Sequence, residues 1–346
     1  MKNRVYGFGF LRTDTLVNQP LLTILMFLIR NRNNFYRFRR PRRLYVYVIS
    51  YILFLLCFKI ALLSADENTI KHYGHGFTPN LRIYTEEYLR LIADESEQRF
   101  GPYNFVVYSK PLSPNRSMKK AERGSEINVL FKSFWDGEYV NEDEVERMDI
   151  PVFFGMLGLR SVIAKPESLA QINSIRSLEQ LRKFSAGFGA RWVDSEVFGH
   201  NNLNVVEANN YRNLFPMLTN GRFDYIPLGQ LEAKQAVTEN QQFYFDFIIV
   251  ESPKIFYPMP IYLYVSKNAN GLYKRLNYGA QRAIKNGKME NLFRQHFKAD
   301  LPQSSEKDAK VPLILLSNPR FSKNKNQVFT KNFLEMYGHH FIPIDK

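Results

Sequence analysis

The stretch from Ser177 to Ala233 constrains the fold more than any other part of the chain, because short apolar runs alternate there with segments of helical periodicity. Strands are predicted at 184–188, 203–208 and 223–228, since each is a short apolar run bounded by turn residues. A glycine-rich turn, GFGA at 187–190, lies between the first strand and the next helix. Strands that alternate with helices of this size pair mostly in parallel, which predicts an α/β fold that binds ligands at the carboxyl ends of its strands.

The positive charge of the chain is concentrated at its N-terminal end. The whole chain has a formal net charge of +14. Residues 1–65 hold eleven of the 47 Lys and Arg residues and one of the 33 Asp and Glu residues, which leaves a net charge of only +4 for residues 66–346. So small an excess gives no electrostatic reason to bind nucleic acid, and we expect no nucleic-acid partner.

The first 65 residues have the order of an export leader. A basic run at 30–43 precedes an apolar stretch at 44–65, which is about the ~20 residues needed to cross a bilayer. Because positive charge ahead of an apolar stretch keeps that side in the cytoplasm, the rest of the chain is predicted to reach the periplasm. Small residues at Ser64 and Ala65 favour cleavage by signal peptidase. The alternative is an uncleaved segment that tethers the protein to the inner membrane.

No residue pattern indicates a cofactor, a metal site or catalysis. The single cysteine, Cys57, lies in the apolar leader, so neither a disulfide nor a Cys-based zinc site is predicted for the exported part. The histidines lack metal-ligand spacing, and the sequence contains no nucleophile elbow and no Walker loop. We therefore predict a binding protein without enzymatic activity, while an enzyme on the same fold stays open because fold does not fix function.

Residues Leu81–Phe297 resemble the periplasmic solute-binding proteins of the amino-acid ABC transporter type, the bacterial extracellular family 3-like group. The segments that carry the resemblance are SLEQLRKF, the GFGA turn and NLFPMLTNGRFDYIP, all within 177–227. The resemblance implies the type 2 fold: two α/β lobes with mostly parallel sheets and two crossover hinge strands, expected at 159–165 and 258–267. In such proteins the ligand lies in the cleft between the lobes, which closes by a hinge motion.

The resemblance also implies a division of the chain into parts. These are a leader at 1–65, the first part of lobe 1 at 80–163, lobe 2 at 164–252, the return to lobe 1 at 253–300, and a C-terminal extension at 301–346 that packs on lobe 1. Within lobe 1, residues 81–87 are predicted to form the first strand and to end in a polar loop.

Arginine receives most weight among the candidate ligand-binding residues, because a guanidinium fork matches a carboxylate bidentately. In the family the carboxylate-binding arginine lies in a Glu-Arg pair before the first crossover, and Glu146-Arg147 matches that pair. Arg160 is the second choice. The alternative role for Arg147 is a surface ion pair with Glu144 or Glu146.

The other candidates lie at predicted strand ends and are Glu86, Tyr88, Trp135, Gly189, Trp192, Asp194 and Glu232. Relatives that bind amino acids place an acid for the ammonium group a few residues after a G-R-x-D run, and this position is Gly229 here. Glu232 would have to take that role. The ligand is therefore predicted to be a small polar, carboxylate-bearing solute other than an ordinary α-amino acid. We expect a monomer that serves an inner-membrane permease; the alternative is a tethered ligand-sensing module that acts on a partner protein.

Overall fold

The computed structural model describes residues 50–52, 68–134, 136, 140–243, 247–301 and 310–344. The chain divides into two compact units, Met1–Leu63 and Ser64–Lys346. In the first unit residues 50–52 are helical, and the rest of the predicted leader lies outside the described residues. None of the helices in the described part of the chain has the length and apolar content needed to traverse a bilayer.

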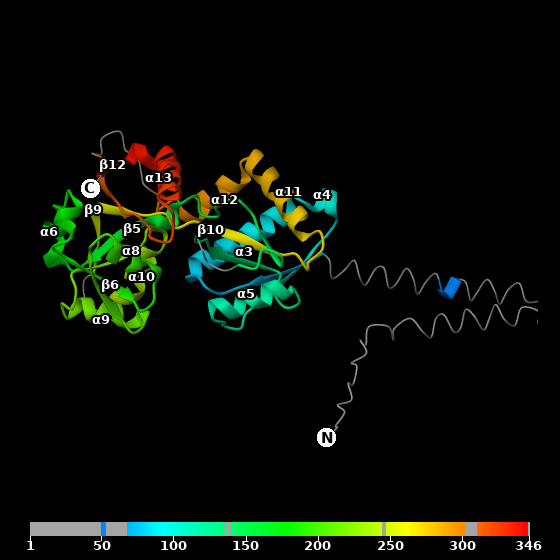
Figure 1. Cartoon of the computed structure of the whole chain (residues 1–346), viewed down its shortest axis with the longest axis horizontal. Helices are drawn as coiled ribbons and strands as arrows, with labels where there is room; N and C mark the ends of the chain where they lie inside the picture. The colour runs from blue at the N-terminus through cyan, green and yellow to red at the C-terminus, as the bar shows by residue number, and fades with distance from the viewer. Residues whose placement is uncertain are drawn as a thin grey trace, which may run out of the picture. The chain divides into compact units, whose positions relative to one another are not determined.

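The second unit contains two lobes, each built on one sheet (Figure 1). The first lobe has a five-stranded sheet of order β2-β1-β3-β10-β4, with β1, β2 and β3 parallel and β10 antiparallel to its neighbours. Its strands are β1 (Thr69–Tyr73), β2 (Asn104–Tyr108), β3 (Val129–Ser133), β4 (Val145–Arg147) and β10 (Ile261–Ser266). Its helices are α3 (Pro79–Asp94), α4 (Glu97–Phe100), α5 (Pro114–Arg123), α11 (Leu272–Lys285) and α12 (Lys288–Phe297).

The second lobe has a seven-stranded sheet of order β12-β11-β9-β5-β8-β6-β7. Its strands are β5 (Leu159–Ala164), β6 (Ser185–Gly189), β7 (Asn204–Ala208), β8 (Tyr225–Gly229), β9 (Ile248–Phe256), β11 (Val311–Leu315) and β12 (Phe341–Ile344). Its helices are α6 (Leu169–Asn173), α7 (Leu178–Leu181), α8 (Val193–His200), α9 (Leu214–Thr219), α10 (Gln230–Gln241) and α13 (Lys323–Tyr337). The predicted strands at 184–188, 203–208 and 223–228 are confirmed as β6, β7 and β8. β6 pairs in parallel with both β7 and β8.

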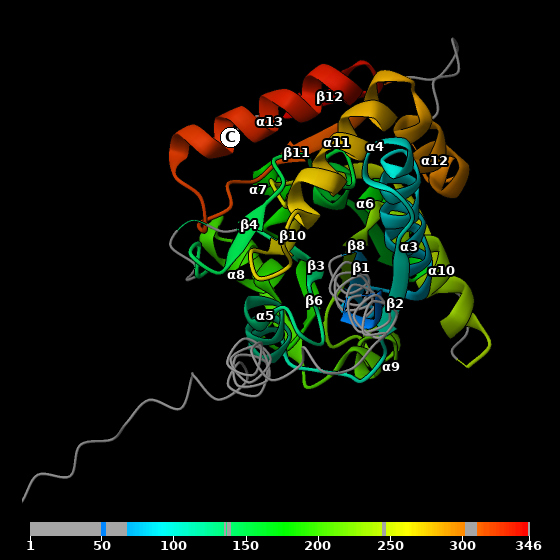
Figure 2. The same cartoon turned by 90° about the vertical axis from the view of Figure 1, so that its right-hand side faces the viewer.

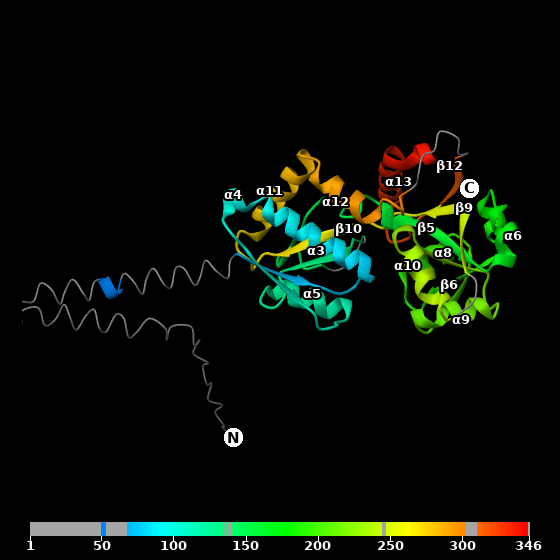
Figure 3. The same ribbon diagram turned by 180° about the vertical axis from the view of Figure 1, so that it is seen from behind.

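Helices cover both faces of the central strands. Figures 1 and 3 show from opposite sides that α3, α5, α11 and α12 surround the strands of the first lobe, whereas α6, α8, α9 and α10 surround those of the second. Every residue of β5, β8 and β10 is buried. Burial on both faces explains why these strands read as nearly continuous apolar runs in the sequence.

The chain passes between the two sheets twice. It leaves β4, enters the second lobe through the 3-10 helix η2 (Met156–Gly158) and β5, and returns from β9 to β10 through residues 257–260. The two crossover segments touch, because a Cβ on Gly158 would lie 2.3 Å from the carbonyl oxygen of Tyr257. Glycine is therefore required where the two connections meet. The predicted two-lobe α/β fold with two crossovers is confirmed.

The predicted strand at 81–87 is wrong, because these residues belong to the helix α3. The first strand of the lobe is the preceding segment TIKHY, β1. Pro79 stands in the first turn of α3, where a missing N–H costs nothing. The buried positions Leu81, Tyr84, Tyr88 and Ile92 recur at helical spacing. The residues of this segment also suit a strand, but burial of these positions in the core of the lobe favours the helix.

The C-terminal extension, which we expected to pack on the first lobe, adds two strands to the sheet of the second lobe. β11 pairs in parallel with β9, and β12 pairs in parallel with β11. Figure 2 shows α13, which connects the two strands, beside them. The β9 edge offers unpaired backbone groups that β11 satisfies. The extension still reaches the apolar cluster of the first lobe, because Phe333 stacks on Phe256 with ring centres 3.9 Å apart.

Candidate functional site

A cavity of about 930 Å³ lies between the two lobes. The first lobe lines it with the segment after β1, the end of β3 and the start of α5, and the second lobe lines it with β5, the start of α8 and one face of α10. The wall holds the acidic and basic residues Lys132, Arg160, Asp194, Glu232 and Glu239, and also His75. A cavity of this size suits a small-molecule ligand.

A buried ion pair lies at the floor of the second-lobe wall. Arg160, near the start of β5, places Nη2 2.8 Å from Oδ1 of Asp194, and both side chains are at most 10% exposed. The hydroxyl of Tyr257 donates to the same carboxylate oxygen, and the Arg160 guanidinium lies 4.8 Å from the centre of the Tyr257 ring. Burial raises the pKa of Tyr257 well above its ordinary value, so the hydroxyl stays protonated and can donate. A buried pair is tolerated when such additional hydrogen bonds satisfy it.

The position of Asp194 follows from the local sequence. α8 begins directly after Trp192, which puts Asp194 in the first helical turn, where backbone N–H groups favour a negative charge. The parallel pairing of β6 and β8 carries the start of α8 to the edge of the sheet at which β5 begins. The strand and the helix therefore present Arg160 and Asp194 to each other without a long connection.

Glu232 occupies the space that a side chain at position 229 would take. A Cβ built on Gly229 would lie 2.6 Å from Oε2 of Glu232 and 3.3 Å from Nη1 of Arg160. Burial raises the pKa of the Glu232 carboxyl; Arg160 lowers it, and Asp194 adds to the rise. Because Gly229 has no side chain, the carboxylate of Glu232, three residues later, can occupy that space. The sequence argument that Glu232 replaces an acid at 229 agrees with this geometry.

An aromatic shelf borders the same wall and consists of Trp192 and Tyr211. Their ring centres lie 6.2 Å apart and their planes are inclined by 23°. A Cβ on Gly189 would lie 2.6 Å from the indole of Trp192, and a Cβ on Gly187 would lie 2.3 Å from the ring of Phe223. The GFGA glycines therefore make room for aromatic rings. Gly189 itself is not among the described residues that line the cavity.

Two candidates from the first lobe lie on α3, away from the cavity wall. Tyr88 is 1% exposed in the apolar core of the lobe, with its ring against Tyr84 and Phe131. It cannot stack on a ligand in the cleft. Glu86 is half-buried on the same helix, near Gly74. Both assignments depended on a strand end at 87, which the helix replaces. Trp135 lies outside the described residues.

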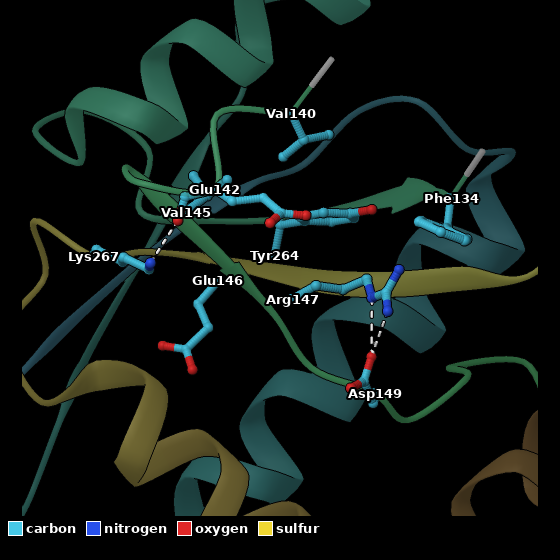
Figure 4. A pocket seen from close by; sticks show the side chains of 9 residues that line it. All are labelled: Phe134, Val140, Glu142, Val145, Glu146, Arg147, Asp149, Tyr264 and Lys267. Carbon is cyan, nitrogen blue, oxygen red and sulfur yellow. Dashed lines mark hydrogen bonds and ion pairs between the residues drawn. The ribbon is translucent and has the colours of Figure 1, made fainter. Parts of the chain in front are cut away.

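Arg147 lies in a different pocket, of about 360 Å³, beside the edge strand β4 (Figure 4). Its Nε and Nη2 donate to Oδ1 of Asp149 at 3.0 and 2.7 Å. The guanidinium lies 4.2 Å from the ring centre of Phe134 and 4.7 Å from that of Tyr262. Its ion-pair partner is Asp149 and not one of the two glutamates we considered. The structure therefore separates Arg147 from the cleft residues Arg160, Asp194 and Glu232.

Among the residues of the cavity wall that sequence reasoning missed are Thr78, Lys132, Tyr211 and Gln235. Thr78 was hidden by the wrong strand at 81–87. Lys132 and Tyr211 lie at or just after the carboxyl ends of β3 and β7, so the strand-end rule was sufficient to find them. Gln235 lies three residues after Glu232 in α10, and this spacing puts both on one face of the helix.

The two sheets, the two crossovers and the cavity between the lobes together define the architecture. The chain has the two-lobe type 2 fold of periplasmic binding proteins. No protein-family model and no curated protein matches the sequence.

Several solved structures are similar to the chain. An ancestral arginine-binding protein bound to arginine is 19% identical, with a TM-score of 0.44, and the match covers 66% of this chain and 98% of that one. The periplasmic VFT2 domain of BvgS from Bordetella pertussis is 17% identical, with a TM-score of 0.47 and coverage of 68% and 96%. The amino acid ABC transporter substrate-binding protein AbpA from Streptococcus pneumoniae, bound to L-arginine, is 18% identical, with a TM-score of 0.42 and coverage of 63% and 84%.

Proposed function

We propose that this protein is an exported solute-binding protein that captures a small polar solute between its lobes by hinge closure and delivers it to an ABC-type transporter. The observation that supports this proposal is the cavity of about 930 Å³, which both lobes line with charged and aromatic side chains. Capture requires no chemical step. The residues 1–65 would then serve as the leader that directs the domain to the periplasm.

Hinge closure follows from the way in which the wall is divided between the lobes. Thr78 and Lys132 belong to the first lobe, whereas Arg160, Trp192 and Glu232 belong to the second. A solute that contacts both sets binds the closed form better than the open form and shifts the population toward closure. A shift from 1:99 to 99:1 needs about 5.5 kcal/mol of differential binding. A few charge-assisted hydrogen bonds made only in the closed form supply this amount.

We propose that the solute bears a carboxylate, and one feature of the cavity wall supports this. Nε of Arg160 is buried without a hydrogen-bond partner among the described residues. Arg160 is the arginine of the cavity wall, so a ligand carboxylate would be held there and not at Arg147. It would approach a guanidinium whose Nη2 is already paired with Asp194.

Ligand screening by thermal shift and by fluorescence tests the proposal. The chain has two tryptophans, Trp135 and Trp192. A Trp135→Phe variant of the full-length chain therefore reports on the cavity through Trp192 alone. Amino acids, dicarboxylates, polyamines and sugars are added in turn, and a ligand at a hundred times its Kd should stabilise the native state by about 2.7 kcal/mol. The proposal fails if no class of solute changes both the melting temperature and the Trp192 emission.

A further inference from the structure

Once the internal pair is set aside, the charged groups of the cavity wall are Lys132 of the first lobe and Glu232 and Glu239 of the second, an excess of one formal negative charge. Arg160 and Asp194 neutralise each other at 2.8 Å. What remains on the second-lobe wall is Glu232 and Glu239, both on α10. Neither carboxylate forms an ion pair with any residue in the described part of the chain. The second-lobe wall therefore holds two carboxyl groups beyond the pair of Arg160 and Asp194; burial raises the pKa of the Glu232 carboxyl, and a cation beside it would favour its charged form.

On α10, between these two carboxylates in the sequence, lies the side-chain amide of Gln235. Nε2 of Gln235 donates to Oε1 of Glu239 at 2.7 Å, and the amide oxygen of Gln235 stays available as an acceptor. That oxygen is buried and has no hydrogen-bond partner among the described residues. A buried acceptor without a donor costs roughly 1–3 kcal/mol. A ligand N–H group placed between Gln235 and Glu232 would remove this cost.

The aromatic shelf lies next to the same carboxylates. The pKa of Tyr211 is raised to about 12, first by burial and then by the negative charges of Glu239 and Glu232. Tyr211, Glu232 and Glu239 line the same cavity. Trp192 stacks on Tyr211. The face of an aromatic ring attracts a cation, and the attraction grows when water is excluded.

From these groups we infer that the solute is a cation, an amine, amidine or guanidine, whose N–H groups bind Glu232 and Gln235 and whose charge lies against Trp192 and Tyr211. The inference rests on the proposed function, because it names the solute of the same cavity. Arg160 is then a positioning residue that holds Asp194. A solute that also bears a carboxylate can place it at Nε of Arg160, but binding of the cationic group does not require one.

The test compares two probes that differ in charge, agmatine and succinate. Agmatine carries a guanidinium and an ammonium and has no carboxylate, whereas succinate carries two carboxylates. Binding is followed by calorimetry and by Trp192 emission on the full-length Trp135→Phe chain. We expect agmatine to bind and succinate not to bind. Glu232→Gln should weaken agmatine about ten- to hundredfold, the range for loss of a charged hydrogen-bond acceptor.

Glu146→Gln is the matched control, because this carboxylate lines the separate pocket of Arg147, and it should leave agmatine binding unchanged. If Glu232→Gln does not fold, Gln235→Leu tests the same acceptor pair and should weaken agmatine as well. Binding of succinate without agmatine overturns the inference and leaves solute capture standing, as does agmatine binding that Glu232→Gln leaves unchanged. If no cation, dicarboxylate, amino acid or sugar changes the Trp192 emission, the proposed function and the inference both fail.

Discussion

Replacing Gly279 with alanine should destabilise the first lobe strongly, because α11 crosses α3 at this residue. A Cβ at position 279 would lie 1.7 Å from the carbonyl oxygen of Ile92 and 2.7 Å from its carbonyl carbon. A carbon atom normally stays about 3.3 Å from such an oxygen, so the helices would have to separate by roughly 1.5 Å, the difference from that contact. Overpacking costs up to ~3 kcal/mol, and the better helix propensity of alanine returns ~1 kcal/mol. We expect a net loss of up to about 2 kcal/mol.

Urea unfolding of the full-length chain measures this loss, and Gly199→Ala is the matched control. Gly199 also lies in a helix, α8, but a Cβ there would meet nothing within 4 Å. The control should be unchanged or more stable by up to ~1 kcal/mol. The two lobes can unfold in separate steps. The urea midpoints of the wild type and both variants are therefore compared for the one transition that shifts in Gly279→Ala. Equal midpoints for Gly279→Ala and the wild type would refute the close crossing of the helices.

Three further predictions follow from burial, from the separation of the two pockets and from the leader. His72 is 1% exposed, and burial lowers its pKa to about 3. Below about pH 6.5, the ordinary pKa of histidine, the unfolded chain therefore binds a proton that the folded chain does not. The free energy of unfolding should fall as the pH drops below this value. His72→Leu should flatten this decline, as measured by urea midpoints between pH 7 and pH 4. Arg147→Lys should leave solute affinity unchanged. Arg160→Lys should weaken solute affinity at least tenfold, because an ammonium cannot keep the planar contact of the guanidinium to Asp194. Calorimetry with a ligand from the screen measures both variants. A reporter enzyme fused after residue 67 should be active outside the cytoplasm, and cytoplasmic activity would contradict the export of the domain.

The second lobe could be predicted strand by strand because its strands are short apolar runs separated by clear turn residues. The run FDYIPL corresponds to β8, and LNVVEA corresponds to β7. The start of the first lobe was not predictable in this way. Residues 81–87 hold apolar and β-branched residues that suit a strand, and only their burial beside later turns of α3 shows the helical period. The edge that accepts β11 depends on pairing over a long sequence distance, which local patterns do not contain.

The candidate site was predictable where it depends on the carboxyl ends of parallel strands. Trp192 and Asp194 follow β6, Glu232 follows β8, and the structure brings all three to one cavity with Arg160. Their roles in ligand binding remain predictions. Arg147 lies in a pocket other than the cleft cavity, which the sequence could not indicate because the resemblance supplies a position along the chain and no information on the neighbouring side chains. Asp149, Phe134 and Tyr262 hold its guanidinium in the other pocket.

The C-terminal extension bears directly on hinge motion, since it is bonded to both lobes. In the second lobe Arg320 pairs with Glu196 of α8 at 2.7 Å. In the first lobe the backbone N–H of Asp136 donates to the carbonyl of Arg320 at 2.9 Å, and its carboxylate accepts from the N–H of Ser322 at 3.0 Å and from Lys325. Surface ion pairs contribute less than ~1 kcal/mol each, so these links bias the angle between the lobes without locking it. Buried charge-assisted hydrogen bonds to a solute contribute roughly 1.5–3 kcal/mol each, so they would outweigh these surface links in setting the angle between the lobes.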